Sequence, residues 1–154
     1  MDHSKKREAR EFCFKYFFHL QLPVFKEMRV AMKEDNQEVL RENLAEFATS
    51  SDFSFESEVS KYVIGLISNT LSQYDETYEK IQTYLKNWKM ERLSKVDQTI
   101  LLLGFSELQM DGKEIYKVII NECIELAKKY GTAESPSFIN GVLDSYAKKE
   151  INVS

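Results

Sequence analysis

The chain has 154 residues, of which 43% are hydrophobic and 30% charged, and its 21 basic and 25 acidic residues give a net charge of −4. This composition is too apolar for a disordered chain and too charged for a membrane span, so it predicts a single globular domain over residues 1–154. The acidic balance excludes a surface that is basic throughout. Any nucleic-acid site must therefore be a local patch.

The counts of special residues favour a helical protein without a metal site. Five glycines and two prolines are few for a fold built on hairpins. Cys13 and Cys123 lie far apart, with no CxxC motif or histidine cluster near either, so we expect two reduced cysteines packed in the core and no metal or other cofactor. The first twelve residues contain no apolar run and no small-residue cleavage site. We therefore expect a cytoplasmic protein without a secretory signal.

Apolar spacing in the first half predicts helices joined by short loops. A first helix over residues 5–22 is expected to end at Pro23, and Phe14 and Phe18 form a second aromatic edge on it. The helix dipole favours anions in the first turns of a helix. The first two turns of this helix instead carry four cations, which indicates that the positive charge serves a purpose other than helix stability. These cations are Lys5, Lys6, Arg7 and Arg10. The remaining elements expected here are a short helix at 28–32, a third after Asp35 or Asn36, a loop at 49–54, and two helices over 55–88 separated at Asp75.

The second half contains the clearest helix boundaries. Ser94 and Asp97 resemble a capping box that opens a strongly apolar helix, which we expect to end at Asp111 and Gly112. The last two expected helices run over 116–129, with Gly131 at the C′ position, and from an N-cap at Ser135 with Pro136 as the first helical residue. The sequence therefore predicts an all-α bundle of about seven helices.

Enzymatic chemistry finds little support in the side chains. His3 and His19 are the two histidines, and neither lies near a persuasive catalytic partner. No GxSxG or SxxK motif frames a serine nucleophile. Glu122 and Glu125 share one helical face, a spacing more typical of a solvated surface than of a metal site. We predict that the protein is not an enzyme.

The basic start of the first helix is the better candidate for a functional site. RNA binding requires cations within reach of phosphates and planar groups for unstacked bases. Arg7 and Arg10 are followed along one sector of the helix by Phe14 and Phe18. Two simpler interpretations stay open, because basic helix ends are commonly solvated and phenylalanines at this spacing commonly belong to a core.

Two strings in the C-terminal half resemble the NusB transcription antitermination family. They are VIINECIELAKKY over residues 118–130 and FINGVLD over 138–144. The resemblance covers most of the chain, is weakest over 25–55, and extends to four further places: Ala9-Arg10-Glu11, Gly65, Asp75 and Glu107-Leu108. It implies a compact helical bundle with two subdomains, in agreement with the predicted helices.

The resemblance also implies a function and a set of contact residues. The family member would be a non-catalytic adaptor that binds the boxA element of ribosomal RNA leader transcripts together with NusE, a small-subunit ribosomal protein, and joins elongating RNA polymerase. The positions implied to contact RNA are Lys5, Lys6, Arg7, Arg10, Phe18 and Phe138. The positions implied to face NusE are Glu91 and Asp97, where acidic charge suits a basic partner.

The chain departs from the family pattern at several positions. Its N-terminus mixes lysine with arginine and includes Glu8, and phenylalanine replaces a common tyrosine at position 18. The chain departs from the family pattern at three further positions, Leu102, Ser106 and Ile115. The sequence does not decide whether these residues change the packing of the interior or a surface that contacts a partner. For four motif residues we favour a role in maintaining the fold, with the glycine permitting close approach of another helix: Asn121, Glu122, Asn140 and Gly141.

Two alternatives accompany the main hypothesis. The chain could be a protein–protein interaction module that keeps the NusB fold with little sequence-specific RNA binding. A related fold forms the N-terminal domain of some ribosomal RNA methyltransferases, but 154 residues leave no room for a catalytic domain, so a methyltransferase is not expected unless the chain is a fragment. Family members occur as monomers and as dimers, so a homodimer that covers the RNA face stays an open alternative.

Overall fold

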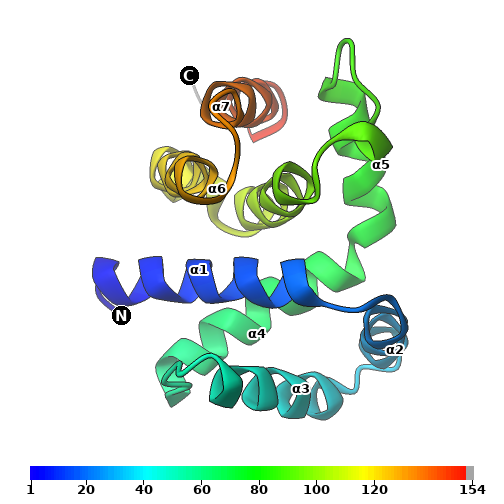
Figure 1. The fold of residues 1–154 in the computed structure, drawn as a ribbon, viewed down its shortest axis with the longest axis vertical. Helices are drawn as coiled ribbons and strands as arrows, with labels where there is room; N and C mark the ends of the chain where they lie inside the picture. The colour runs from blue at the N-terminus through cyan, green and yellow to red at the C-terminus, as the bar shows by residue number, and fades with distance from the viewer. Residues whose placement is uncertain (152–154) are drawn as a thin grey trace. The chain divides into compact units, whose positions relative to one another are not determined.

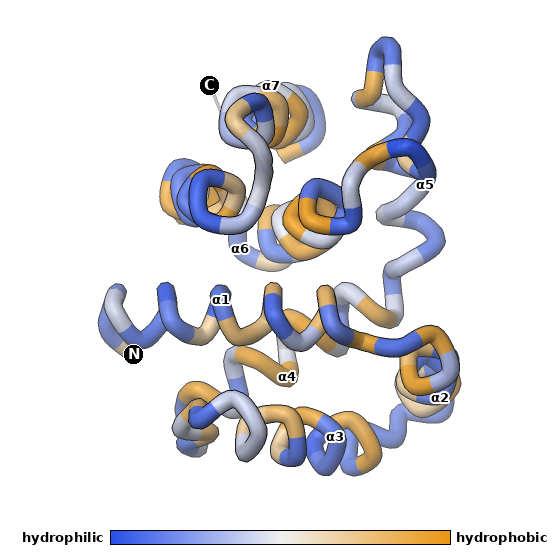
Figure 2. Tube along the Cα trace, in the orientation of Figure 1, coloured by the Kyte–Doolittle hydropathy of each residue, from blue (hydrophilic) through white to orange (hydrophobic). Residues whose placement is uncertain are grey.

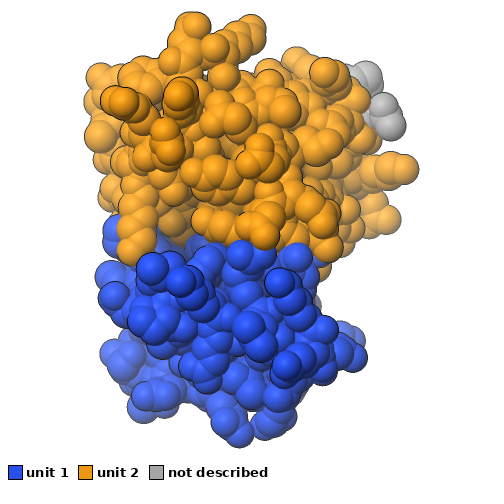
Figure 3. Space-filling model, turned by 90° about the vertical axis from the view of Figure 1, so that its right-hand side faces the viewer, with its two compact units in different colours: residues 1–72 blue, residues 73–154 orange. Residues whose placement is uncertain are grey.

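The computed structural model describes residues 1–151, and all regular structure in that range is helical. The chain forms two compact units, Met1–Ser72 and a second that begins at Gln73 (Figure 3). The predicted all-α fold with seven α-helices is confirmed. The elements are α1 (His3–His19), α2 (Leu22–Lys33), α3 (Gln37–Ser50), α4 (Ser57–Ser72), α5 (Tyr74–Tyr84), the 3₁₀ turn η1 (Met90–Arg92), α6 (Lys95–Tyr130), α7 (Ser135–Tyr146) and the π-helical turn η2 (Ala147–Ile151) (Figure 1).

The first unit places α1 against α4, with α2 and α3 also packed on α4. Asp2 caps α1, because its carboxylate accepts a hydrogen bond of 2.9 Å from the Lys5 amide. The start of α1 is hydrophilic and its later turns are apolar, as Figure 2 shows. The buried side chains of α1 are Ala9, Arg10, Phe12, Cys13, Phe14, Tyr16 and Phe17.

Two aspartates end helices in the first unit. Asp35 and Asp52 have φ angles of 54° and 52°, in the left-handed region that commonly follows a helix end. One residue later, the Asn36 amide donates to the Ala31 carbonyl at 2.8 Å, and a matching bond of 3.0 Å follows Asp52. These are the bonds of a Schellman motif, so aspartate occupies the position where glycine is most common.

Several predicted boundaries in the first three-fifths of the chain are wrong. α1 ends at His19, and Pro23 lies in the first turn of α2, where a missing amide is tolerated, so the second helix is longer than predicted. The break near Asp75 is confirmed, because α4 ends at Ser72 and α5 begins at Tyr74. The expected helical run to Trp88 stops at Tyr84, which leaves the Trp88 side chain 58% exposed.

The second unit is built on α6 and α7, which pack closely against each other. The predicted cap at Ser94 is confirmed, because its hydroxyl accepts a bond of 3.1 Å from the Asp97 amide. The predicted helix end at Asp111 lies too early, because the helix continues to a kink at Ile115 (φ −130°, ψ 30°), but the kink confirms the expected interruption before the helix over 116–129. Ser135 is the first residue of α7 rather than its N-cap, and its hydroxyl accepts a bond of 3.1 Å from the Thr132 amide.

Aromatic rings fill the interior of the second unit. Phe105 is 0% exposed and stacks on Tyr146, with ring centroids 4.1 Å apart. Leu102 and Ser106 are buried on the same helix, so these two departures from the family pattern occupy the interior rather than a partner surface. Ile115 is half-buried at the kink of α6.

The C-terminal turn is attached to α5 through one carboxylate. Glu150 lies 2.8 Å from the Lys80 ammonium and accepts a short hydrogen bond from the Tyr84 hydroxyl. The bond from Lys80, and then that from Tyr84, lower the pKa of Glu150 below its ordinary value. Because the folded pKa lies below the unfolded one, this stabilisation is present at neutral pH and is lost as the pH falls through the folded value.

We expect Glu150→Gln to lower the free energy of unfolding by about 0.5 kcal/mol at pH 7, a small effect because the pair is partly solvated. The difference from the parent protein should vanish once the carboxyl is protonated in both states, well below the unfolded pKa of ~4.3. Thermal unfolding at neutral and acidic pH measures this, with Glu79→Gln on the exposed surface of α5 as the control. An equal loss at both pH values would contradict the account.

Candidate nucleic-acid interface

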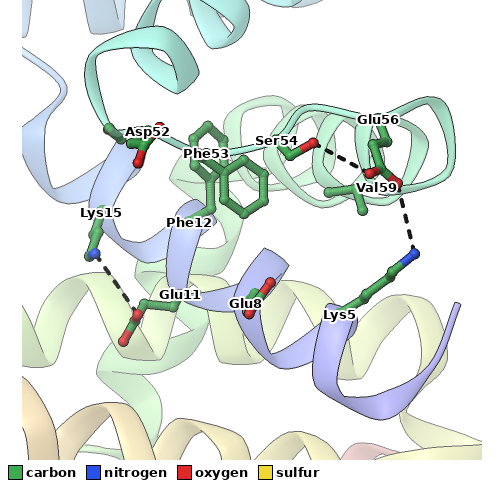
Figure 4. Close-up of a pocket in the computed structure, with 11 residues that line it drawn as sticks. Lys5, Glu8, Glu11, Phe12, Lys15, Asp52, Phe53, Ser54, Glu56 and Val59 are labelled. Atoms are coloured by element: carbon green, nitrogen blue, oxygen red, sulfur yellow. Dashed lines mark hydrogen bonds and ion pairs between the residues drawn. The ribbon is translucent and has the colours of Figure 1, made fainter.

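One side of the basic end of α1 faces an acidic pocket of about 420 Å³ between α1 and the segment that joins α3 to α4. Figure 4 shows Lys5 reaching Glu56, with a nitrogen–oxygen distance of 3.8 Å, and Lys15 reaching Glu11 at 3.9 Å. Four carboxylates and two lysines line the pocket: Glu8, Glu11, Asp52, Glu56, Lys5 and Lys15. The excess of negative charge disfavours RNA phosphates on this side of α1.

Two stacked aromatic rings hold the pocket in place. Phe12 of α1 and Phe53 of the joining segment stack with their centroids 4.2 Å apart. Phe12 is 2% exposed, so it belongs to the core of the first unit as well as to the pocket wall. The acidic rim is therefore a fixed feature of the folded unit.

The other predicted cations of α1 do not line this pocket, and two of them, Lys6 and Arg10, lie near α4. The Lys6 ammonium lies 5.6 Å from the centre of the Tyr62 ring, and the Arg10 guanidinium lies 5.8 Å from it. Arg10 is 5% exposed, whereas Arg7 is exposed and Lys6 is half-buried. Burial removes Arg10 from the surface that a phosphate could reach, so Lys6 and Arg7 are the predicted cations outside the pocket that α1 offers to RNA.

Tyr62 had no signal in the sequence analysis. Its ring supports two cations from another helix, an interaction that holds a positive group in place without neutralising it. No spacing rule links a residue of α4 to the start of α1, and only their packing in the first unit brings them together.

Phe18, the aromatic predicted to stack on a base, is half-buried at the end of α1. Its ring stacks on that of Phe14, with centroids 5.7 Å apart, and Phe14 is 2% exposed. The i, i+4 pair therefore contributes to packing, and the role of Phe18 in RNA binding stays a prediction.

Phe138 and Asp97, predicted to contact different partners, line one pocket of the second unit. The pocket has a volume of about 270 Å³ and lies between the segment that precedes α6 and the turn that precedes α7. Trp88 and Arg92, which the sequence analysis did not select, also line it. Glu91 is exposed next to Arg92 but is not part of the pocket wall.

The carboxylate of Asp97 is only partly satisfied. Its Oδ1 atom is buried and has no hydrogen-bond partner among the described residues. The side chain lies in the first turn of α6, where the helix dipole stabilises negative charge. Asp97 therefore has one buried oxygen without a hydrogen-bond partner among the described residues, in a pocket that Trp88 and Phe138 also line.

The four motif residues divide into buried and exposed positions. Glu122 is 5% exposed, in agreement with a role in the fold. Asn121 and Asn140 are exposed. Gly141 is exposed too, and a Cβ atom there would meet nothing within 4 Å among the described residues, so the prediction that it permits close approach of another helix is wrong.

Gly141→Ala is expected to raise the free energy of unfolding by about 0.5–1 kcal/mol, because alanine has the higher helix propensity and the added methyl group clashes with nothing. Chemical denaturation of the purified variant measures this. A loss of stability would show that the surface of α7 at Gly141 is packed after all.

Other kinds of site find no support in the described range. Residues 1–151 contain no group of three or more histidine, cysteine or acidic side chains placed to hold a metal ion. Cys13 and Cys123 are both buried, as predicted. No helix in this range is long and apolar enough to cross a membrane.

The fold and these surfaces define an all-helical protein with an exposed basic helix end and an aromatic pocket. The model of the NusB family matches residues 7–148, and the chain belongs to that family. The transcription antitermination protein NusB of Thermodesulfovibrio yellowstonii is 33% identical over 96% of this chain and 94% of its own length. The NusB protein of Clostridium botulinum strain Kyoto is 36% identical over 90% of this chain and 96% of its own.

Two solved structures share the fold. T. maritima NusB is 26% identical, with a TM-score of 0.70 over 93% of this chain and 90% of that chain. A protein in a structure described as a plectonemic RNA supercoil has a TM-score of 0.73 over 97% of this chain and 99% of its own. At 22% identity that second likeness shows the fold alone.

Proposed function

We propose that this protein is an RNA-binding antitermination factor that binds boxA-type single-stranded RNA of ribosomal RNA leaders together with NusE and joins elongating RNA polymerase. Membership in a family of transcription antitermination proteins supports the class of function. A factor that acts on nascent bacterial transcripts works in the cytoplasm.

The observation that carries the RNA-binding part is the asymmetry of α1. The acidic pocket lies on one side of α1, whereas Lys6 lies against Tyr62 of α4 and Arg7 is exposed, and neither cation lines the pocket. A phosphate backbone would follow Lys6 and Arg7, with Lys5 at its edge, because these two cations lie outside the pocket in which carboxylates outnumber lysines. Phe138, half-buried at the pocket in the second unit, supplies a planar face for an unstacked base.

The protein-binding part rests on charge complementarity. Glu91 is exposed in η1, and a carboxylate there suits a basic ribosomal protein. Glu91 is adjacent in sequence to Arg92, which lines the pocket that contains Phe138. RNA bound in that pocket and NusE bound at Glu91 would therefore lie near each other.

A titration of labelled boxA RNA with the purified protein, with and without NusE, tests the proposal. We expect the protein alone to bind the RNA and NusE to tighten the complex, because each partner adds contacts to the other. Binding of NusE that is indifferent to boxA RNA, with no RNA binding by the protein itself, would overturn the proposal in favour of a protein–protein interaction module.

A further inference from the structure

We infer that the pocket formed by Trp88, Arg92, Asp97 and Phe138 binds one guanine base of the RNA. The inference rests on the proposed RNA binding and goes beyond it by naming the base and the residues that recognise it. All four residues belong to the second unit and line the same cavity of about 270 Å³. That volume lies below the range of ~300–1,000 Å³ typical of pockets for drug-sized ligands, so it suits a single ring system.

Two aromatic side chains line the pocket. Trp88 approaches from the segment before η1, and Phe138 from the first turns of α7. Trp88 is 58% exposed, an unusual state for the largest apolar side chain and one that a stacked base would relieve. Aromatic side chains that hold unstacked bases are a common device of single-stranded RNA recognition.

The carboxylate of Asp97 selects among the bases. An ionised carboxylate only accepts hydrogen bonds, and the Oδ1 atom of Asp97 has no partner among residues 1–151. Guanine is the base whose Watson–Crick edge presents two adjacent donors, the N1–H and the N2 amino group. Adenine, cytosine and uracil each place an acceptor nitrogen or oxygen next to their donor, which a carboxylate repels.

Arg92 completes a nucleotide site. It is exposed at the pocket rim, where its guanidinium can pair with the phosphate of the bound nucleotide. Asp97 and Glu134, which also lines the pocket, would repel that phosphate, and Arg92 offsets one of these two negative charges. On this inference Asp97 contacts RNA, whereas the family resemblance implied that it faces the protein partner.

Trp88 is the single tryptophan of the chain, so its intrinsic fluorescence reports on this pocket. We would titrate the full chain with three short RNAs that are identical except at one central position: uridine, guanosine or inosine. Inosine lacks the N2 amino group and keeps the rest of the guanine edge. We expect guanosine RNA to quench Trp88 fluorescence and to bind about tenfold more tightly than inosine or uridine RNA.

Asp97→Asn separates base recognition from simple charge. If Asp97 accepts from guanine, the variant should lose the preference for guanosine over inosine while it still binds uridine RNA. If Asp97 only repels phosphate, the variant should bind all three RNAs more tightly by the same factor, which would overturn the inference. Glu91→Gln is the matched control, because it removes one negative charge from the neighbouring surface and leaves the pocket intact.

The remaining outcomes distinguish this inference from the proposed function. Binding of all three RNAs with equal affinity and no quenching of Trp88 would overturn the guanine pocket and leave the proposed function standing. Failure to bind any RNA, with or without NusE, would overturn both. If Asp97→Asn loses NusE binding and keeps the same RNA selectivity, the pocket binds the protein partner rather than a base, and the inference is overturned.

Discussion

Replacement of Lys6 and Arg7 together by alanine is expected to lower the affinity for single-stranded RNA by about 30- to 150-fold at moderate salt. Each residue is assigned one phosphate contact, and a hydrogen bond to a charged group contributes about 1–1.5 kcal/mol here. Two such losses amount to about 2–3 kcal/mol, and each 1.4 kcal/mol is a factor of ten. Anisotropy titrations with labelled boxA RNA measure the change.

The salt dependence shows whether those lost contacts are phosphate contacts. The slope of log affinity against log salt should become shallower by about 1.4, because each phosphate contact in single-stranded RNA contributes about 0.7. Lys26→Ala with Lys33→Ala is the matched control, since it removes two exposed cations from α2 of the same unit. Equal losses in both double variants would show that only the net charge of the unit matters.

Gly131→Ala is expected to lower the free energy of unfolding by about 2–3 kcal/mol. The backbone of Gly131 is extended, with φ −94° and ψ −165°, so alanine could adopt its conformation. The obstacle is space: a Cβ atom there would lie 2.8 Å from the Ala127 carbonyl oxygen and 2.6 Å from the Ser135 hydroxyl oxygen. Backbone and a helix start would both have to move.

Gly141→Ala is the internal control for that experiment, because it makes the same substitution in the same unit where space is open. The two variants should therefore change the free energy of unfolding in opposite directions in urea denaturation. A Gly131→Ala protein as stable as the parent would contradict the close packing between the end of α6 and the start of α7.

Helix existence was predictable because it depends on local patterns, whereas some boundaries depend on packing. The cap at Ser94 follows from its own hydroxyl and a neighbouring amide. The expected end of that helix at Gly112 failed because Gly112 is buried, and a Cβ atom there would lie 3.1 Å from Ile151. The glycine at this point provides space for the C-terminal turn rather than a break in α6.

The candidate interface was only half predictable for the same reason. The cations of α1 are adjacent in sequence, so Lys6 and Arg7 could be selected directly. The burial of Arg10, the support from Tyr62 and the acidic pocket beside Lys5 arise from contacts between helices far apart in sequence. The role of Trp88 in the pocket was not predicted, because the apolar periodicity of the sequence continues past the end of α5 and assigned Trp88 to the buried face of a helix.

Ultraviolet crosslinking of boxA RNA to the full protein, followed by mass spectrometry of the crosslinked peptides, tests the central claim most directly. The account predicts crosslinks at the start of α1 around Lys6 and Arg7 and at the pocket containing Trp88 and Phe138. Crosslinks confined to other surfaces, or to the acidic pocket beside Lys5, would contradict it.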